Sequence, residues 1–242
     1  MKIYGKNPVL ERLKSNPRSI RKIFIAEGHP EASYIRGKSQ KWGIPILTVP
    51  HSKLLKLGRS LNTQGLLMEV EDFGYTPYPD LLEQAKAKGQ TLLLLDHLTD
   101  PQNLGGIIRS AACLGNFAIV LPIHESVEVT ETVLRVACGG ENFIPIARVS
   151  NLGQAIKEAK KSEFWIAGAV VKDGKNLYEV QWPFPLALVV GSEQKGIRDI
   201  LRKQLDLEVT IPMAFPRLSL NAAHALTAFC YEITKQKNQK QA

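Results

Sequence analysis

The segment Leu92–Gly115 contains residues that could hold a ligand, because an apolar run leads through a polar loop to a glycine pair and an arginine. Gly105 and Gly106 each cost roughly 1 kcal/mol relative to alanine inside a helix, so their place in a first turn indicates that another group comes close to the backbone. Asn103 is predicted to cap this helix. Arg109 lies beside the apolar stripe of the helix, as either a surface residue or a ligand for an anion.

A second segment, Leu186–Gly196, joins an apolar run to a loop with the glycine spacing of a phosphate loop. Ile197-Arg198 stands where that motif requires a lysine followed by serine or threonine, which argues against a nucleoside triphosphate site. Glu193 in this loop is either a functional residue or a structural one, because a carboxylate at a strand-to-helix turn can complement the helix dipole without any further role.

The third segment, Val209–Leu226, ends an apolar run at Pro212 and begins a helix at Ser219 or Asn221. Capping of the helix explains one of these polar residues but not both without strain. In open α/β sheets ligands bind at the carboxyl ends of the strands, so all three segments are candidates for a binding site.

Other kinds of chemistry lack their sequence patterns. The five histidines show neither paired metal spacing nor an HExxH arrangement, and the three cysteines are scattered, which favours a reducing compartment such as the cytoplasm. No Gly-x-Ser-x-Gly elbow is present, and no G-x-G-x-x-G follows a strand. No apolar run approaches the ~20 residues that a membrane span requires.

The excess of positive charge lies in the first third of the chain. Residues 1–75 contain 13 Lys and Arg against 6 Asp and Glu, whereas residues 76–242 contain 18 against 17. This distribution favours a module that docks on a polyanion such as RNA, although a basic surface without a specific partner has the same composition.

The pattern of apolar residues predicts two α/β units that position these segments. Residues 1–71 alternate short strands and helices, residues 72–80 contain the turn formers of a linker, and residues 81–242 contain longer apolar strands separated by helices. Such runs are typical of a mostly parallel sheet covered on both faces. In this second unit the predicted strands are Thr91–Leu95, Phe117–Leu121, Phe164–Val170, Leu186–Gly191 and Leu207–Ile211. The predicted helices are Leu81–Lys88, Leu104–Leu114, Thr130–Ala137, Leu152–Lys160, Ile197–Lys203 and Ser219–Thr234, followed by a frayed basic tail.

Taken together and in order, the three segments resemble the SpoU/TrmH family of RNA ribose 2′-O-methyltransferases, within the SPOUT superfamily. The similar stretches are Asp96–Arg109, Leu188–Ile197, Ile211–Met213 with Ser219–Glu232, and the weaker Val136–Gly140. Ile3–Val9 resembles the start of the small ribosomal-protein-like RNA-binding domain that precedes the catalytic domain in many members. The chain is most similar to the RlmB-like branch, which modifies a guanosine ribose in large-subunit (23S) rRNA.

The resemblance implies a trefoil knot in the C-terminal domain, S-adenosyl-L-methionine as cofactor, and a homodimer with shared active sites. The residues expected to contact the cofactor, mostly through backbone, are Gly191, Ile211, Met213 and Leu220. The residues expected around the reacting ribose are Asn103, Arg109, Glu193, Ser219 and Asn221.

A ribose hydroxyl is a poor nucleophile while protonated, so its positioning and its proton are the chemical problem. The resemblance offers Arg109 as the base, but a guanidinium has a pKa above ~12 and stays charged. We expect Arg109 to stabilise the developing alkoxide and clamp a phosphate, with Asn103 orienting it or the ribose and Glu193 fixing it through a charge-assisted pair.

One stretch departs from the family pattern, since Ala222-Ala223-His224 follows Ser219–Asn221 where the family commonly has Val-Ser and a small apolar pair. We expect His224 to be a packed or capped residue. Two other functions stay open: methylation of tRNA by the same chemistry, and a non-catalytic role in RNA binding or ribosome assembly. A plain nucleotide-binding α/β protein is disfavoured by the missing fingerprints.

Overall fold

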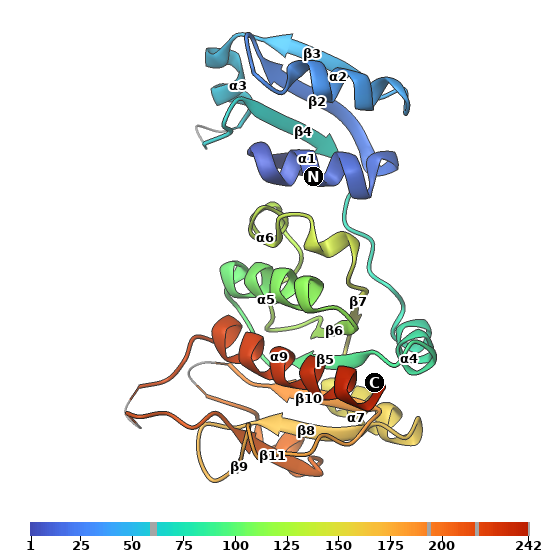
Figure 1. The fold of residues 1–242 in the computed structure, drawn as a ribbon, viewed down its shortest axis with the longest axis vertical. Helices are drawn as coiled ribbons and strands as arrows, with labels where there is room; N and C mark the ends of the chain where they lie inside the picture. The colour runs from blue at the N-terminus through green and yellow to red at the C-terminus, as the bar shows by residue number, and fades with distance from the viewer. Residues whose placement is uncertain (59–61, 193–194, 216–217, 242) are drawn as a thin grey trace.

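The computed structural model describes residues 1–58, 62–192, 195–215 and 218–241. Figure 1 shows two domains stacked along the long axis of the molecule and joined by an extended linker. Residues 71–77, between the last strand of the first domain and the first helix of the second, have no regular secondary structure.

The N-terminal domain is a mixed four-stranded sheet in the order β1-β4-β2-β3, in which β1 and β2 both run antiparallel to β4 and β3 runs parallel to β2. Its strands are β1 (Lys2–Tyr4), β2 (Ile20–Ala26), β3 (Ile46–Val49) and β4 (Leu66–Val70), and its α-helices are α1 (Lys6–Ser15), α2 (Ala32–Gln40) and α3 (His51–Leu57). The sequence did not predict β1 or α3. Both are too short for hydrophobic periodicity to show.

The C-terminal domain contains seven parallel strands in the order β7-β6-β5-β10-β8-β11-β9, which confirms the predicted parallel sheet. The strands are β5 (Thr91–Leu95), β6 (Phe117–Pro122), β7 (Ile146–Val149), β8 (Trp165–Ala169), β9 (Lys175–Asn176), β10 (Leu186–Val190) and β11 (Leu207–Thr210). The sequence missed β7 and β9, the two edge strands.

Helices cover both faces of this sheet. The helices are α4 (Tyr78–Ala87), α5 (Pro101–Leu114), α6 (Glu131–Ala137), α7 (Leu152–Lys161), α8 (Asp199–Arg202) and α9 (Ala222–Gln241). Alternate residues of β5 divide between the faces: Leu93 and Leu95 pack with α5, α6 and α9, whereas Leu92 and Leu94 pack with α4, α7 and α8. Burial on both faces explains why the strands are continuously apolar.

Several predicted helix starts were wrong by two or three residues, since α4 begins at Tyr78 rather than Leu81 and α8 at Asp199 rather than Ile197, whereas the alternative start of α9 at Asn221 was right to within one residue. Helix α5 begins at Pro101, and its N-cap is Asp100, whose carboxylate accepts a hydrogen bond from the backbone N–H of Gln102 at 2.8 Å. Asn103 therefore lies inside the helix rather than at its cap. Helix α9 begins after Asn221 rather than at Ser219, and the side-chain oxygen of Asn221 accepts a hydrogen bond from the N–H of Ala223 at 2.9 Å.

The predicted frayed tail was also wrong, because α9 continues to Gln241. Gln236 is buried; its amide oxygen accepts from the N–H of Trp182 at 3.0 Å, and its amide nitrogen donates to the carbonyl of Val180 at 2.8 Å. Lys237 donates to the carbonyl of Gly89 at 2.7 Å, and burial lowers its pKa to about 8. Tertiary hydrogen bonds, which composition does not reveal, hold this polar segment in place.

A buried ion pair joins the two domains. Arg12 of α1 donates to Glu141 at 2.7 Å, and both side chains are almost fully buried. Next to it, a Cβ on Gly139 would lie 2.3 Å from Cγ of Glu11, so the glycine lets α1 pack against the C-terminal domain. The knot that the resemblance implies stays a prediction.

Candidate active site

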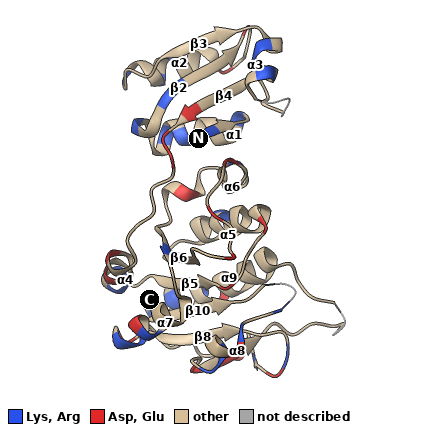
Figure 2. Ribbon diagram, turned by 180° about the vertical axis from the view of Figure 1, so that it is seen from behind, with Lys and Arg blue, Asp and Glu red and all other residues tan. Residues whose placement is uncertain are grey.

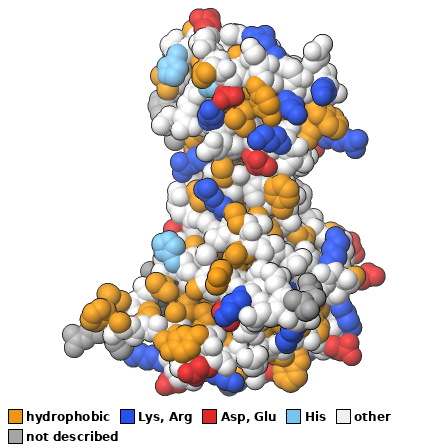
Figure 3. Space-filling view, in the orientation of Figure 1, with side chains coloured by type: hydrophobic (Ala, Val, Ile, Leu, Met, Phe, Trp, Pro, Cys, Tyr) orange, Lys and Arg blue, Asp and Glu red, His pale blue; other side chains and the backbone are white. Residues whose placement is uncertain are grey.

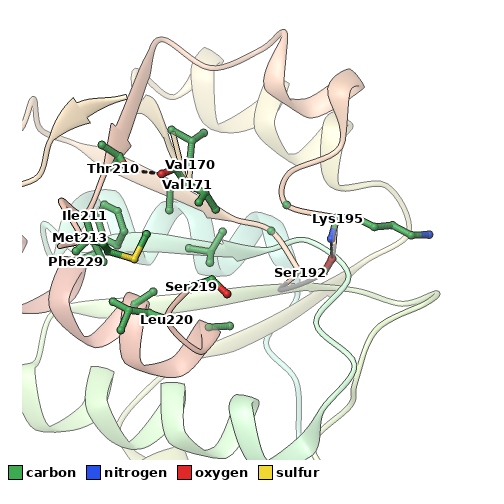
Figure 4. Close-up of a pocket in the computed structure, with 16 residues that line it drawn as sticks. Val170, Val171, Ser192, Lys195, Thr210, Ile211, Met213, Ser219, Leu220 and Phe229 are labelled. Atoms are coloured by element: carbon green, nitrogen blue, oxygen red, sulfur yellow. Dashed lines mark hydrogen bonds between the residues drawn. The ribbon is translucent and has the colours of Figure 1, made fainter. Parts of the chain in front are cut away.

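A cavity of about 330 Å³ lies at the carboxyl ends of β8, β10 and β11, beside the start of α9 (Figure 4). All four residues that the sequence predicts for cofactor contacts line it, together with one of the predicted ribose ligands. These residues are Gly191, Ile211, Met213, Leu220 and Ser219. The second and third motif segments, separated along the chain, therefore meet in one cavity.

Gly191 has no room for a side chain. A Cβ at this position would lie 2.0 Å from the carbonyl carbon of Gly196 and 2.3 Å from the backbone nitrogen of Ile197. The loop is closed by a hydrogen bond of 2.9 Å from the N–H of Gly196 to the carbonyl of Ser192. Because backbone packs directly on backbone here, this part of the cavity wall leaves no space for a side chain at position 191.

Several lining residues were not predicted from the sequence. Val170 and Val171 follow β8, Thr210 ends β11, and Phe229 comes from α9. The hydroxyl of Thr210 donates to the carbonyl of Val171 at 3.0 Å and so ties the ends of neighbouring chain segments together (Figure 4). For Val170, Val171 and Thr210 the place at strand ends was the available signal, since residues after adjacent parallel strands gather at the same edge of the sheet.

A smaller polar cavity of about 220 Å³ adjoins the first one, and Ser192 and Lys195 line both. Asn103 lines the polar cavity and is only 5% exposed. The side-chain nitrogen of Asn221 donates to the side-chain oxygen of Asn103 at 2.7 Å. The first and third motif segments are thus joined by a direct hydrogen bond between two predicted site residues.

Asp96 and Arg198 connect the first motif loop to the second. Asp96, at the end of β5, is fully buried and accepts hydrogen bonds from Nε of Arg198 at 2.9 Å and from its backbone N–H at 3.0 Å. His97 lies between the carboxylates of Asp96 and Glu125, at 2.8 and 2.6 Å. The hydrogen bond from His97 lowers the pKa of Glu125. This cluster, which the sequence reading missed, fixes the two loops relative to each other.

Arg109 does not reach either cavity within one chain. It lies six residues beyond Asn103 on α5, which at 3.6 residues per turn places it about 120° away around the helix and ~9 Å further along it. Its side chain is exposed and lines a different cleft, between the two domains. The predicted ribose site is therefore divided between two faces of α5.

Two further predictions concern residues near the site. Glu193 lies outside the described residues. His224 is exposed and is absent from the lining of both cavities, and its backbone N–H donates to the side chain of Asn221 at 3.4 Å. The neighbouring Ala222 lines the larger cavity.

Comparison with known proteins divides the chain in the same way as its fold. The family model SpoU rRNA Methylase matches residues 90–231, and the model RNA 2′-O ribose methyltransferase substrate binding matches residues 2–76. The putative TrmH family tRNA/rRNA methyltransferase YacO of Bacillus subtilis is 35% identical over 98% of this chain and 96% of its own length. The chain belongs to the SpoU/TrmH family of RNA 2′-O ribose methyltransferases.

Solved structures support the fold of this methyltransferase across both domains. The SpoU methyltransferase AviRb of Streptomyces viridochromogenes, in complex with AdoMet, has a TM-score of 0.81 at 23% identity and covers 98% of this chain and 90% of its own. An AdoMet-bound rRNA methyltransferase of Sinorhizobium meliloti has a TM-score of 0.79 at 24% identity and covers 97% and 86%.

Metal and membrane sites are not found in the described part of this methyltransferase. No group of three or more His, Cys, Asp or Glu side chains there is arranged to hold a metal ion. None of the described helices has the length and apolar character to cross a membrane.

Proposed function

We propose that the larger cavity binds S-adenosyl-L-methionine and that the protein methylates the 2′-hydroxyl of a ribose in RNA. The cavity has the size of a small-molecule site, and its walls combine backbone atoms with the apolar side chains of Ile211, Met213 and Leu220. Such walls fit a nucleoside that carries a sulfonium-bearing chain, and Gly191 lets the loop pack tightly enough on the backbone of Gly196 to shape the wall. The meeting of three motif segments at adjoining cavities is the observation that carries the proposal.

Bound S-adenosyl-L-methionine supplies a methyl group on a sulfonium, which departs as a neutral thioether. The residues of this chain have to position the ribose hydroxyl and offset the charge that develops on its oxygen. Asn103 and Asn221, held together at 2.7 Å, are suited to orient the ribose in the polar cavity. Ser219 lines the cofactor cavity and extends the same polar edge. Glu193 is proposed to fix the guanidinium of Arg109.

We propose that Arg109 acts in the active site of a second copy of the chain. The side chain of Arg109 lies on a different side of α5 from the two cavities of the same chain. If an arginine completes the site, it therefore has to come from another copy of the chain. Large apolar side chains are exposed in the segment before α9 and on the helix itself, among them Phe215 (70%), Leu218 (65%) and Tyr231 (62%). Figure 3 shows hydrophobic side chains gathered over this part of the surface. A two-fold homodimer through α5 and α9 would bury them.

The RNA substrate is proposed to be large-subunit rRNA, with a guanosine as the modified nucleotide. The support is the separate basic domain in front of the catalytic one, matched by a substrate-binding model over residues 2–76. Figure 2 shows Lys and Arg on α1, β2 and α3 of that domain. We propose residues 1–71 as the docking domain, 72–80 as the linker and 81–242 as the catalytic domain. The three cysteines are free, which fits a cytoplasmic location.

The test is incubation of the purified protein with methyl-labelled S-adenosyl-L-methionine and total bacterial RNA, followed by mapping of the labelled riboses. Label on one guanosine of large-subunit rRNA supports the proposal in full. Label on tRNA supports the second candidate, tRNA methylation, which the name of the 35% identical B. subtilis relative leaves open. Cofactor binding without any methyl transfer to RNA would favour a non-catalytic RNA-binding role.

A further inference from the structure

A cleft of about 380 Å³ lies between the two domains on the side of Arg109. Its walls come from the start of the N-terminal domain, from the turn before β4, and from α5 and α6 of the catalytic domain. Figure 1 shows α1 above α6 and α5 at this junction. The cleft is separate from both cavities described above and shares only Arg109 with the predicted site residues.

The charges of the cleft select a polyanion. Arg109 and Arg135 line it, and its lining contains no Asp or Glu. Among the ion pairs between described residues, the arginines 12, 148, 198 and 202 each have a carboxylate partner, whereas neither arginine of the cleft has one. Both guanidinium groups are exposed. Arg135 lies 5.8 Å over the ring of Tyr4, which holds it at the wall of the cleft.

The opposite opening between the domains differs in charge. It has a volume of about 570 Å³ and is lined by three acidic residues, Glu71, Asp72 and Glu141, against two basic ones, Arg12 and Lys88. Arg12 is already paired with Glu141 at 2.7 Å. Of the two openings, only the one at Arg109 is suited to a phosphate backbone.

The cleft also presents amide side chains. Asn7, Asn62, Gln64 and Gln102 line it. The side-chain oxygen of Gln64 accepts from the N–H of Lys6 at 2.8 Å, and that of Asn62 accepts from the N–H of Gln64 at 3.2 Å. Because both side-chain oxygens accept hydrogen bonds from backbone N–H groups, the orientation of both amides is fixed. Their NH₂ groups take no part in these two hydrogen bonds. Fixed amides next to arginines are suited to read the edges of unstacked bases.

We propose that this cleft binds a single-stranded segment of the RNA substrate next to the modified nucleotide. The inference rests on the proposed function and adds a second RNA subsite to it. A volume near 380 Å³ accommodates about one nucleotide, since sites of roughly 300–1,000 Å³ hold ligands of that size. Arg135 contacts a phosphate, and the RNA strand continues past Arg109 to the reaction centre of the second copy, in which Arg109 is proposed to act. The N-terminal domain thereby contributes a wall of the path as well as basic surface.

The experiment compares Arg135→Gln with Lys88→Gln in the full-length protein. Each removes one positive charge from an opening between the domains, but only Arg135 lines the proposed site. Binding of a short fluorescein-labelled single-stranded RNA is measured by anisotropy as a function of salt, without cofactor. Arg135→Gln should weaken binding by about tenfold and reduce the slope of log affinity against log salt by about one. Lys88→Gln should change neither.

Two further readouts separate a binding role from a structural one. In methyl transfer, Arg135→Gln should raise the KM for RNA while kcat and the Kd for cofactor stay as in the wild type, and Arg135→Lys should restore most of the salt slope. Photo-cross-linking with 4-thiouridine RNA should label the segment around Asn7 and the start of α5. Thermal unfolding checks that the variants are folded.

The proposal is overturned if Arg135→Gln binds the RNA as the wild type does, or if Lys88→Gln weakens it equally. Cross-links confined to the remote β3 edge of the N-terminal domain would also contradict it. Failure of the proposed function has a different signature: the wild type would bind RNA with the predicted dependence on Arg135 and still transfer no methyl group.

Discussion

The larger cavity, which we propose as the cofactor site, and the interdomain cleft differ in what builds them. The cavity is formed within one domain from backbone and apolar side chains at the ends of adjacent parallel strands, and Gly191 packs there against Gly196 with no space between them. The cleft is formed by polar side chains from two domains, and its arginines are exposed. A rigid, mostly apolar cavity suits a small cofactor of fixed shape, whereas a cleft with exposed arginines suits a large, flexible anion.

The largest expected effect on the difference between the two sites is the loss of cofactor binding when a side chain is added at Gly191. In Gly191→Ala the new Cβ would overlap the backbone of Gly196 at 2.0 Å, so the loop must move and binding of labelled cofactor should fall below detection by isothermal titration. Gly37→Ala is the control, because a Cβ there meets nothing within 4 Å. Circular dichroism has to show a folded domain in both variants. Normal cofactor affinity in Gly191→Ala would show that the cavity is not the cofactor site.

The next largest effect is expected at Arg109. Arg109→Ala should lower kcat by about a hundredfold to a thousandfold, because a charged group that stabilises a developing oxyanion is lost. The Kd for the cofactor should be unchanged, since Arg109 does not line the cavity. Arg202→Ala, which removes an exposed arginine paired with Glu208, is the matched control. Full activity of Arg109→Ala would refute its catalytic role.

The shared site can be tested with the same variant. Mixing Arg109→Ala with a Gly191→Ala variant should restore up to about a quarter of the wild-type activity if the two residues act across a two-fold interface, by random assortment of subunits. No recovery, with dimers confirmed by light scattering, would place both residues in one chain's site.

The ion pair between the domains should affect stability rather than chemistry. Arg12→Ala leaves the buried Glu141 without its partner and should lower the free energy of unfolding by about 3–5 kcal/mol. The exposed pair Lys86–Glu163 is the comparison, and Lys86→Ala should cost less than about 1 kcal/mol. Urea unfolding measures both. Equal losses in the two variants would show that burial does not set the strength of the interdomain pair.

The effect of Arg12→Ala should depend on pH. Burial raises the pKa of Glu141, so this carboxylate is protonated more easily in the folded state than in the unfolded chain. A raised pKa stabilises the fold at pH below the ordinary carboxyl pKa, and this contribution is lost as the pH rises through the folded value. Without Arg12 the pKa of Glu141 rises further, so the deficit relative to the wild type should shrink as the pH falls from 7 towards ~4. A deficit that is constant with pH would contradict this.

The smallest effects separate two polar residues of the third motif. Asn221→Ala removes the cap of α9 and should cost about 0.5–2 kcal/mol of stability, measured by urea unfolding. Ser219 is exposed and lies before the helix, so Ser219→Ala should change stability by less than about 0.5 kcal/mol while slowing single-turnover methyl transfer. A large loss of stability in Ser219→Ala would mean that its role is structural.

The sequence by itself determined the parallel sheet and the family, because continuous apolar strands and three motif segments of characteristic composition are local patterns. Four of the predicted cofactor contacts line one cavity for the same reason, since residues that follow neighbouring parallel strands meet at one edge. Edge strands such as β9 and the tethered end of α9 were missed, because the bonds that hold them come from residues far away in the chain.

Only the tertiary structure decided how the site is divided. Asn103 and Arg109 belong to one sequence motif, but the pitch of α5 turns them to different sides, one bonded to Asn221 and the other facing the cleft. The hydrogen bond from Arg198 to the buried carboxylate of Asp96 likewise joins residues separated by 102 positions. The spacing of two residues along a helix fixes the angle between their side chains around the helix axis. Which cavity or cleft each side chain then lines depends on how the helices, strands and domains pack.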